Sequence, residues 1–158
     1  MQSTATVIQW FCSARGRFCH LSTLIMARIL LIDDDNSVRT ILGLALADLG
    51  HTVIEARNGK EGLELFRNAK ADLVITDIVM PEKEGFEVLM KLTKKHPSVK
   101  IIAMSGGGRH NAKNYLQTAR LMGAAKVLEK PFSNEVLVAA INELLPGGGS
   151  SLQPPVIP

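Results

Sequence analysis

The stretch RILLIDDD, residues 28–35, decides the fold of this chain. Its four consecutive apolar residues, 29–32, form the kind of run that is buried on both faces of a parallel sheet. Three carboxylates follow at once. Beyond them, apolar residues recur at helical spacing on one face, at Val38, Ile41, Leu42, Ala45 and Leu49. The stretch therefore predicts a buried strand that leads, through an acidic loop, into a helix.

The same alternation of apolar run and helical pattern repeats along the chain. We expect strands over 29–32, 52–56, 73–76, 99–104 and 126–129. We expect helices over 36–49, around 63–69, and over 86–96, 112–122 and 133–145. Gly50 and Gly123 suit helix C-terminal caps, and Ser133 suits an N-cap. Five strands that alternate with five helices predict an α/β fold, a doubly wound parallel sheet with helices on both faces.

Composition fits one globular domain. The chain has 158 residues, 46% of them apolar and 21% charged, and no apolar run approaches the ~20 residues of a membrane span. The net charge of +3 comes from three arginines within residues 1–28, which hold no acid, so the basic pI does not indicate nucleic-acid binding. Both cysteines, Cys12 and Cys19, lie in the same segment, which suits a reducing compartment such as the cytoplasm.

These patterns divide the chain into three parts. Residues 1–27 form an N-terminal extension that we interpret as disordered or as an artefact of start-site choice, with a functional extension and a targeting segment as alternatives. Met26 precedes the first strand and resembles a natural start. Residues 28–145 form the domain. Residues 146–158 are rich in Pro and Gly, which predicts a flexible tail.

Polar and charged side chains stand where the expected strands end: Asp33, Asp34 and Asp35 after the first, Asp77 after the third, Ser105 after the fourth and Lys130 after the fifth. The carboxyl ends of parallel strands share one edge, so we expect these groups to converge. Clustered carboxylates need a cation, and oxygen ligands without His or Cys favour Mg²⁺. Lysine and hydroxyl groups suit phosphate oxygens, which predicts a carboxylate that accepts a phosphoryl group. Asp35 is expected only to cap the first helix.

Four segments resemble the receiver domain of two-component response regulators. They are ILLIDDD (29–35), TDIVMP (76–81) with Gly85 four residues further on, IIAMS (101–105) and LEKPF (128–132). Each is weak alone, but they run in the family's order and spacing, and the resemblance covers 28–145. It implies the flavodoxin-like strand order 2-1-3-4-5 and a stand-alone receiver similar to the single-domain chemotaxis type.

The resemblance also implies a role for each residue that handles the phosphoryl group. Asp77 would be the phosphoacceptor. Ser105 would hydrogen-bond the phosphoryl group once formed, and Lys130 would pair with it. The bond from Lys130 to Pro131 is expected to be cis.

A second set of roles concerns the metal, which the resemblance implies to be Mg²⁺. Asp34 would bind the ion directly and Asp33 through the metal's water shell. Asp77 and the backbone carbonyl of Val79 would complete the protein ligands.

The partners follow from the same resemblance. The phosphodonor would be a histidine kinase or a histidine phosphotransfer protein, and an unknown downstream protein would read the signal by contact. We expect no nucleic acid, no membrane and no enzymatic activity beyond self-phosphorylation and self-dephosphorylation, in a monomer or weak dimer.

Two positions depart from the family's pattern. Val127 stands where many receivers carry the Tyr or Phe that couples the site to the output face, so we hypothesise that the loop 106–111 and the fourth helix carry more of the signal. Val79 and Gly107 stand where side chains help to place the hydrolytic water, and neither can do so. This predicts slow self-dephosphorylation of Asp77.

Three other functions compete. An aspartyl-nucleophile phosphatase needs a second acid two residues after the nucleophile, where this chain has Val79. A flavodoxin-like cofactor binder needs a Ser/Thr/Gly-rich loop after the first strand, where Asp33 and its neighbours would repel a phosphate. A receiver-like module that binds proteins without phosphorylation has no support in the sequence, because all five chemical positions are filled, and it is kept as the alternative.

Overall fold

The computed structural model of the chain describes residues 6–7, 24–81, 84–106 and 112–145. The strands are β1 (Thr6–Val7), β2 (Leu24–Ile25), β3 (Arg28–Ile32), β4 (Thr52–Ala56), β5 (Leu73–Asp77), β6 (Lys100–Gly106) and β7 (Lys126–Lys130). The helices are α1 (Asn36–Asp48), α2 (Gly59–Ala69), α3 (Glu84–Lys95), α4 (Ala112–Leu121) and α5 (Asn134–Leu144).

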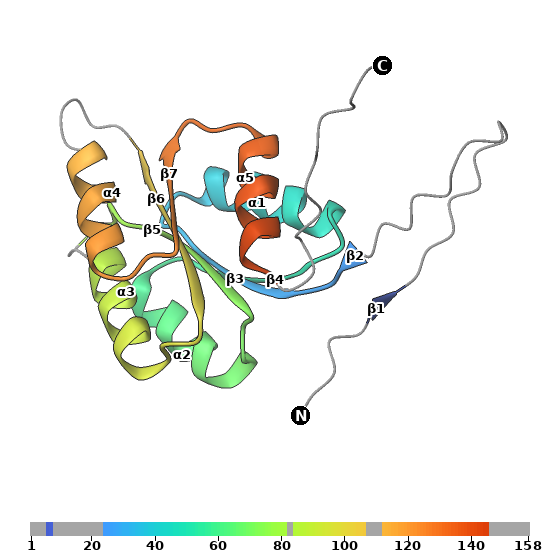
Figure 1. Ribbon diagram of the computed structural model, residues 1–158, viewed down its shortest axis with the longest axis horizontal. Helices are drawn as coiled ribbons and strands as arrows, with labels where there is room; N and C mark the ends of the chain where they lie inside the picture. Colours follow the sequence, from blue (N-terminus) through green and yellow to red (C-terminus); the bar gives the residue numbers. More distant parts are fainter. Residues whose placement is uncertain (1–5, 8–23, 82–83, 107–111, 146–158) are drawn as a thin grey trace, which may run out of the picture.

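The five strands of the domain form one parallel sheet in the order β4-β3-β5-β6-β7 (Figure 1). Counted along the domain, this is the order 2-1-3-4-5, which confirms the prediction. The order reverses between β3 and β5, so the loops after these two strands lead to opposite sides of the sheet. A crevice beyond the carboxyl ends is expected at such a switch point.

Helices cover both faces of the sheet (Figure 1). One core lies under α2, α3 and α4, where Phe66, Leu89 and Ala119 meet alternate strand residues. The other lies under α1 and α5, where Leu46 and Ile141 meet the remaining ones. This division explains the continuous apolar runs, because a strand covered on both sides must be apolar at every position.

The predicted helix ends are confirmed at three places. The Asp35 carboxylate accepts hydrogen bonds from the first-turn amides of α1 and caps that helix. Gly50 and Gly123 follow α1 and α4 with φ of +85° and +102°, a conformation that glycine adopts at little cost. Ser133 occupies the N-cap of α5, but its hydroxyl makes no capping hydrogen bond, and the expected cap interaction is absent there. The Ser133 hydroxyl instead bonds the Glu135 carboxylate and lowers its pKa.

Two strand predictions need correction. The strand expected over 99–104 runs on to Gly106, because Gly106 pairs with Lys130 of β7. Ser105 therefore lies within the strand rather than after its end. The pattern also missed β1 and β2, which form a separate antiparallel pair. Our interpretation of 1–27 as an extension stays a prediction, and the tail 146–158 lies outside the described residues.

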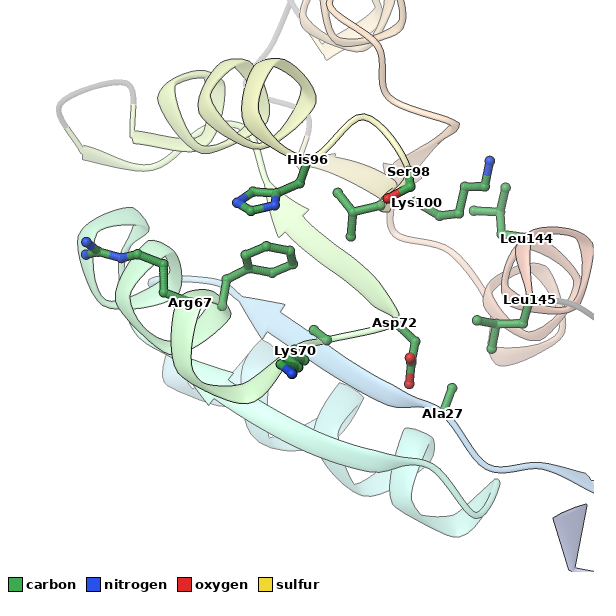
Figure 2. A pocket seen from close by; sticks show the side chains of 12 residues that line it. Ala27, Arg67, Lys70, Asp72, His96, Ser98, Lys100, Leu144 and Leu145 are labelled. Atoms are coloured by element: carbon green, nitrogen blue, oxygen red, sulfur yellow. The ribbon is translucent and has the colours of Figure 1, made fainter. Parts of the chain in front are cut away.

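A pocket of about 630 Å³ lies at the amino ends of the strands (Figure 2). Ala27, just before β3, and Asp72, just before β5, form part of its lining, and Leu145 closes one side. Asp72 is engaged there, since its carboxylate accepts the Arg28 N–H at 2.8 Å. The pocket is at the edge of the sheet opposite to the acidic residues. Among the described residues, no helix is long and apolar enough to cross a membrane.

Candidate phosphoacceptor site

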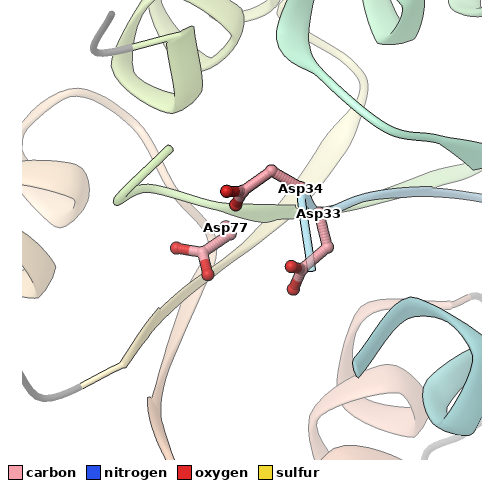
Figure 3. Close-up of side chains that lie close together, drawn as sticks. All are labelled: Asp33, Asp34 and Asp77. Carbon is pink, nitrogen blue, oxygen red and sulfur yellow. The ribbon is translucent and has the colours of Figure 1, made fainter. Parts of the chain in front are cut away.

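Two strands at the switch point deliver the acidic residues. Asp33 and Asp34 follow directly on β3, and Asp77 is the last residue of the neighbouring strand β5. Figure 3 shows their three carboxylates side by side. One oxygen from each lies within 4.8 Å of the other two, and Asp33 and Asp77 are buried while Asp34 is exposed. The convergence predicted from the strand ends is therefore confirmed.

The geometry of this acidic cluster fits a hard divalent cation. Buried carboxylates so close together repel one another strongly in a medium of low polarity. A set of carboxylate ligands of which one, Asp34, is exposed suits Mg²⁺, which keeps several water ligands. The acidic triad is typical of the Mg²⁺ site of receivers.

Lys130, at the end of β7, supplies a cation from the protein itself. Its Nζ lies 2.6 Å from Asp33 Oδ2 and 2.6 Å from Asp77 Oδ2. Burial alone would lower the pKa of this ammonium group, but the hydrogen bonds and negative charges of Asp33 and Asp77 outweigh burial and raise the pKa. The ammonium therefore stays charged and joins two of the three acids.

The Asp33 side chain is fixed on both of its oxygens. Oδ2 accepts from Lys130, and Oδ1 accepts the Asp35 N–H at 3.0 Å. The Asp33 N–H donates to the Ala56 carbonyl of β4 at 3.2 Å. A buried carboxylate with this many partners has little freedom to rotate, so its geometry is set before any ligand binds.

Asp77 has one donor on each carboxylate oxygen. Oδ1 accepts the Val79 N–H at 2.7 Å, and Oδ2 accepts from Lys130. Each oxygen keeps a free lone pair, so either can react or bind a cation. Val79 lies two residues beyond the end of β5, so its carbonyl belongs to the loop that follows Asp77, and its role as a metal ligand stays a prediction.

Ser105 is fully buried. Its hydroxyl has no hydrogen-bond partner among the residues that the structure describes. It stands on β6 one residue beyond Met104, which pairs in register with Asp77. An unpaired buried hydroxyl costs free energy unless a partner arrives. Its place at this edge is consistent with the predicted bond to a phosphoryl group.

Two histidines, His96 and His51, make their contacts with residues outside the acidic cluster. His96 packs against Phe66 with ring centroids 5.0 Å apart, and His51 accepts a long hydrogen bond from the Ala27 N–H. Burial lowers the pKa of His51. The Lys130–Pro131 bond is cis, as expected. The glycine-rich loop after β6 lies largely outside the described residues.

The sequence patterns did not identify Arg39 as a residue that contacts the site. Arg39, on the first turns of α1, donates to the Asp33 carbonyl at 2.8 Å. In the sequence it looked like an ordinary polar position on an amphipathic helix. The only available signal was its spacing of six residues from Asp33, which places it one turn into the helix that follows the acidic loop.

Comparison with known proteins shows to which protein family the chain belongs. Residues 29–142 match the model of the response regulator receiver domain. With the fold and the acidic cluster above, this match shows that the chain belongs to the family of response regulator receiver domains. These are signalling phosphoacceptors rather than conventional enzymes, and they receive the phosphoryl group from histidine kinases.

The similar proteins include one that the match covers over its full length and others that are much longer than the matched region. Protein PilH of Pseudomonas aeruginosa is 36% identical over 124 residues, which cover 77% of this chain and 100% of PilH. The DNA-binding transcriptional regulator NtrC of Azospirillum brasilense is 36% identical over 135 residues, or 84% of this chain and 26% of NtrC. The chain thus spans about a quarter of the length of NtrC and of similar curated regulators.

A solved structure agrees with the fold. The response regulator receiver domain protein from Clostridium thermocellum is 32% identical, with a TM-score of 0.69. The match covers 75% of this chain and 94% of that chain.

Proposed function

We propose that this protein is a phosphorylation switch that accepts a phosphoryl group on Asp77 from a histidine kinase or histidine phosphotransfer protein and passes the signal by protein–protein contact. The observation that carries the proposal is the Lys130 ammonium held 2.6 Å from both Asp33 and Asp77, with Asp34 beside them. We propose that it acts as a stand-alone receiver in the cytoplasm, as a monomer or weak dimer.

The transfer uses a carboxylate oxygen of Asp77 as the nucleophile. This oxygen forms a bond to phosphorus while the bond from phosphorus to the donor imidazole breaks, and the electron pair leaves with the imidazole, which takes up a proton. The Val79 N–H already holds one oxygen of Asp77 and thereby orients the carboxylate for in-line attack.

Two further side chains receive the new group. Lys130 offers an ammonium to the phosphoryl oxygens in place of one of its carboxylate partners, and the Ser105 hydroxyl gains a hydrogen bond that none of the described residues provides. Both interactions are stronger with the phosphorylated than with the free carboxylate. They can therefore turn phosphorylation into a local rearrangement at the ends of β6 and β7.

Asp33, Asp34, Asp77 and the Val79 carbonyl would hold Mg²⁺. When bound, the ion neutralises charge on the transferring phosphoryl group. The residues fit it, because three carboxylates converge where Lys130 joins only two of them.

The alternative is a receiver-like module that binds proteins without phosphorylation. The Ser105 hydroxyl favours the phosphoacceptor, because no described residue bonds this buried group and a phosphoryl group on Asp77 would supply a partner. A Mg²⁺-dependent phosphatase is disfavoured because Val79 cannot act as a general acid.

The test is the intact mass of the full chain after incubation with acetyl phosphate, with and without Mg²⁺. We expect one phosphoryl adduct that requires Mg²⁺ and is absent from Asp77→Asn. A suitable matched control is Asp72→Asn, at the opposite edge of the sheet, which should accept the group normally. Folded protein that binds Mg²⁺ and forms no adduct would support the phosphorylation-independent module instead.

A further inference from the structure

We infer that Arg39 is a positioning residue for the metal-binding acids: its guanidinium fixes the peptide group between Asp33 and Asp34 and so sets the direction of the Asp34 side chain. The inference rests on the proposed function, since it assigns a task within the same site. It concerns a residue that stands on a helix outside the acidic cluster.

The contacts of Arg39 reach three parts of the fold. One terminal nitrogen donates to the Asp33 carbonyl at 2.8 Å, and the other donates to Asn36 Oδ1 at 2.7 Å. Nε lies 3.4 Å from Glu55 Oε2 on β4. The side chain is only 13% exposed. A planar guanidinium with fixed donor directions can hold all three groups at once, whereas an ammonium cannot.

The Asp33 carbonyl belongs to the peptide group that joins Asp33 to Asp34. The amide on the other side of Asp33 is bound to the Ala56 carbonyl, and the Asp35 N–H is bound to Asp33 Oδ1. The bond from Arg39 therefore completes the fixation of this loop. Because the Asp34 Cα follows directly on this peptide group, its orientation decides where the exposed Asp34 carboxylate points.

Glu55 holds the guanidinium from the other side, and Gly43 leaves space for it. A Cβ at Gly43 would lie 2.7 Å from Glu55 Oε1. A methyl group there would meet Glu55 and not Arg39 itself, and it would displace the flexible end of Glu55, the acid that pairs with the guanidinium. The substitution Gly43→Ala is therefore a mild perturbation of the same arrangement, and alanine is the better helix former.

Charge and positioning predict opposite effects of removing Arg39. A positive charge near a Mg²⁺ site opposes the ion, so charge alone predicts tighter Mg²⁺ binding in Arg39→Met. Positioning predicts weaker binding, by about tenfold, the lower end of what partners of metal ligands contribute. Arg39→Lys keeps the charge and loses the planar fork, so positioning predicts that it also weakens binding.

The experiment is a calorimetric Mg²⁺ titration of the full chain, paired with residue-resolved hydrogen exchange in Mg²⁺-free buffer. We expect weaker Mg²⁺ binding in both Arg39 variants and faster exchange of the Asp35 amide. Gly43→Ala should shift both quantities in the same direction by less. Arg57→Met removes a matched arginine that pairs with Glu61 on the surface, and it should leave the Asp35 exchange unchanged.

The inference is overturned if Arg39→Met binds Mg²⁺ as tightly as the wild type or more tightly, or if Arg39→Lys behaves as the wild type. Should the Arg39 variants not fold, Gly43→Ala decides alone: unchanged Asp35 exchange contradicts the inference and faster exchange supports it. If the wild type binds no Mg²⁺ and accepts no phosphoryl group, the proposed function fails. The exchange comparison still decides whether Arg39 orders the loop.

Discussion

At the scale of single residues, Val79 combines two properties that bear on the lifetime of the phosphorylated state. Its backbone N–H donates to an Asp77 carboxylate oxygen at 2.7 Å, and the residue as a whole is 47% exposed. The backbone therefore orients the acceptor, while the apolar side chain offers nothing to orient an attacking water.

We therefore expect Val79→Asn to shorten the lifetime of the Asp77 phosphoryl group by at least about tenfold, because a positioned polar group assists water attack. The measurement is the decay of the phosphorylated mass after the phosphodonor is removed, without added phosphatase. Val136→Asn changes an equally exposed valine on α5 and should leave the decay unchanged. A wild-type phosphoryl group that already decays at the fast end of the family would contradict the expectation.

A second residue-scale prediction concerns Lys130, whose pKa is raised in the folded protein because Asp33 and Asp77 outweigh its burial. A raised pKa stabilises the fold fully below the unfolded value near 10.4, and this stabilisation is lost as the pH rises through the folded value. Removing the cation leaves two buried acids unpaired. Lys130→Met should thus cost about 3 kcal/mol at pH 8 without Mg²⁺.

Urea unfolding of the wild type and Lys130→Met between pH 8 and 11 tests this prediction, and the difference should shrink above about pH 10.4. Lys126→Met is the matched control, because Lys126 stands on the same strand and pairs with Glu143 at the surface. It should cost at most about 1 kcal/mol. An equal loss in both variants would mean that the two acids do not depend on Lys130.

At the scale of elements, α3 approaches the end of β5 closely enough to exclude any side chain. A Cβ at Gly85 would lie 2.2 Å from the Asp77 carbonyl oxygen and 2.6 Å from the Ile78 Cα. Both neighbours are backbone atoms, which cannot move aside as a flexible side chain can. The first turn of α3 therefore packs directly against the backbone of Asp77 and Ile78, and only a glycine at position 85 allows this contact.

Gly85→Ala should lower the free energy of unfolding by about 3 kcal/mol, because the added methyl group overpacks the contact. It should also weaken Mg²⁺ binding, since it pushes on the Asp77 backbone. Gly106→Ala is the control: its nearest neighbour would be Lys130 Cδ at 3.8 Å, and its effect should stay within about 1 kcal/mol. Urea unfolding of both variants measures the difference, and equal stabilities would rule out the close packing of α3 on β5.

At the scale of the whole molecule, three acids crowded at one edge of the sheet repel one another and lower the stability of the fold. A cation that binds there only in the folded state must raise the stability of the entire domain. The pocket at the opposite edge contains no comparable cluster of acids among the residues that line it. Ligand-linked stability therefore reports on the acidic edge.

We expect Mg²⁺ at 100 times its Kd to stabilise the wild type by about 2.7 kcal/mol, or roughly 10 °C in Tm. Chelation with EDTA should reverse the shift. Asp34→Asn should abolish most of it and, without Mg²⁺, should be at least as stable as the wild type, because it removes repulsion. Thermal unfolding with and without the ion provides the measurement. An equal shift in Asp34→Asn would place the ion elsewhere.

The sequence alone determined the sheet, its helical layers and the edge that carries the chemistry. Short apolar runs such as 29–32, which alternate with helical patterns, favour strands covered on both sides, and parallel strands bring their carboxyl ends together. The set of groups at that edge, with Asp77 and Lys130 among them, followed without any knowledge of contacts. Their roles as phosphoacceptor and as the partner of the phosphoryl group stay predictions.

Only the tertiary structure decided how these groups contact one another. Lys130 joins Asp33 across 97 positions of the chain, and Gly106 pairs with Lys130, which draws Ser105 into the strand. Arg39 reaches the peptide group behind Asp33. A sequence pattern records which face a residue occupies. It does not record strand register or side-chain direction, because these depend on packing between segments that are distant in the chain.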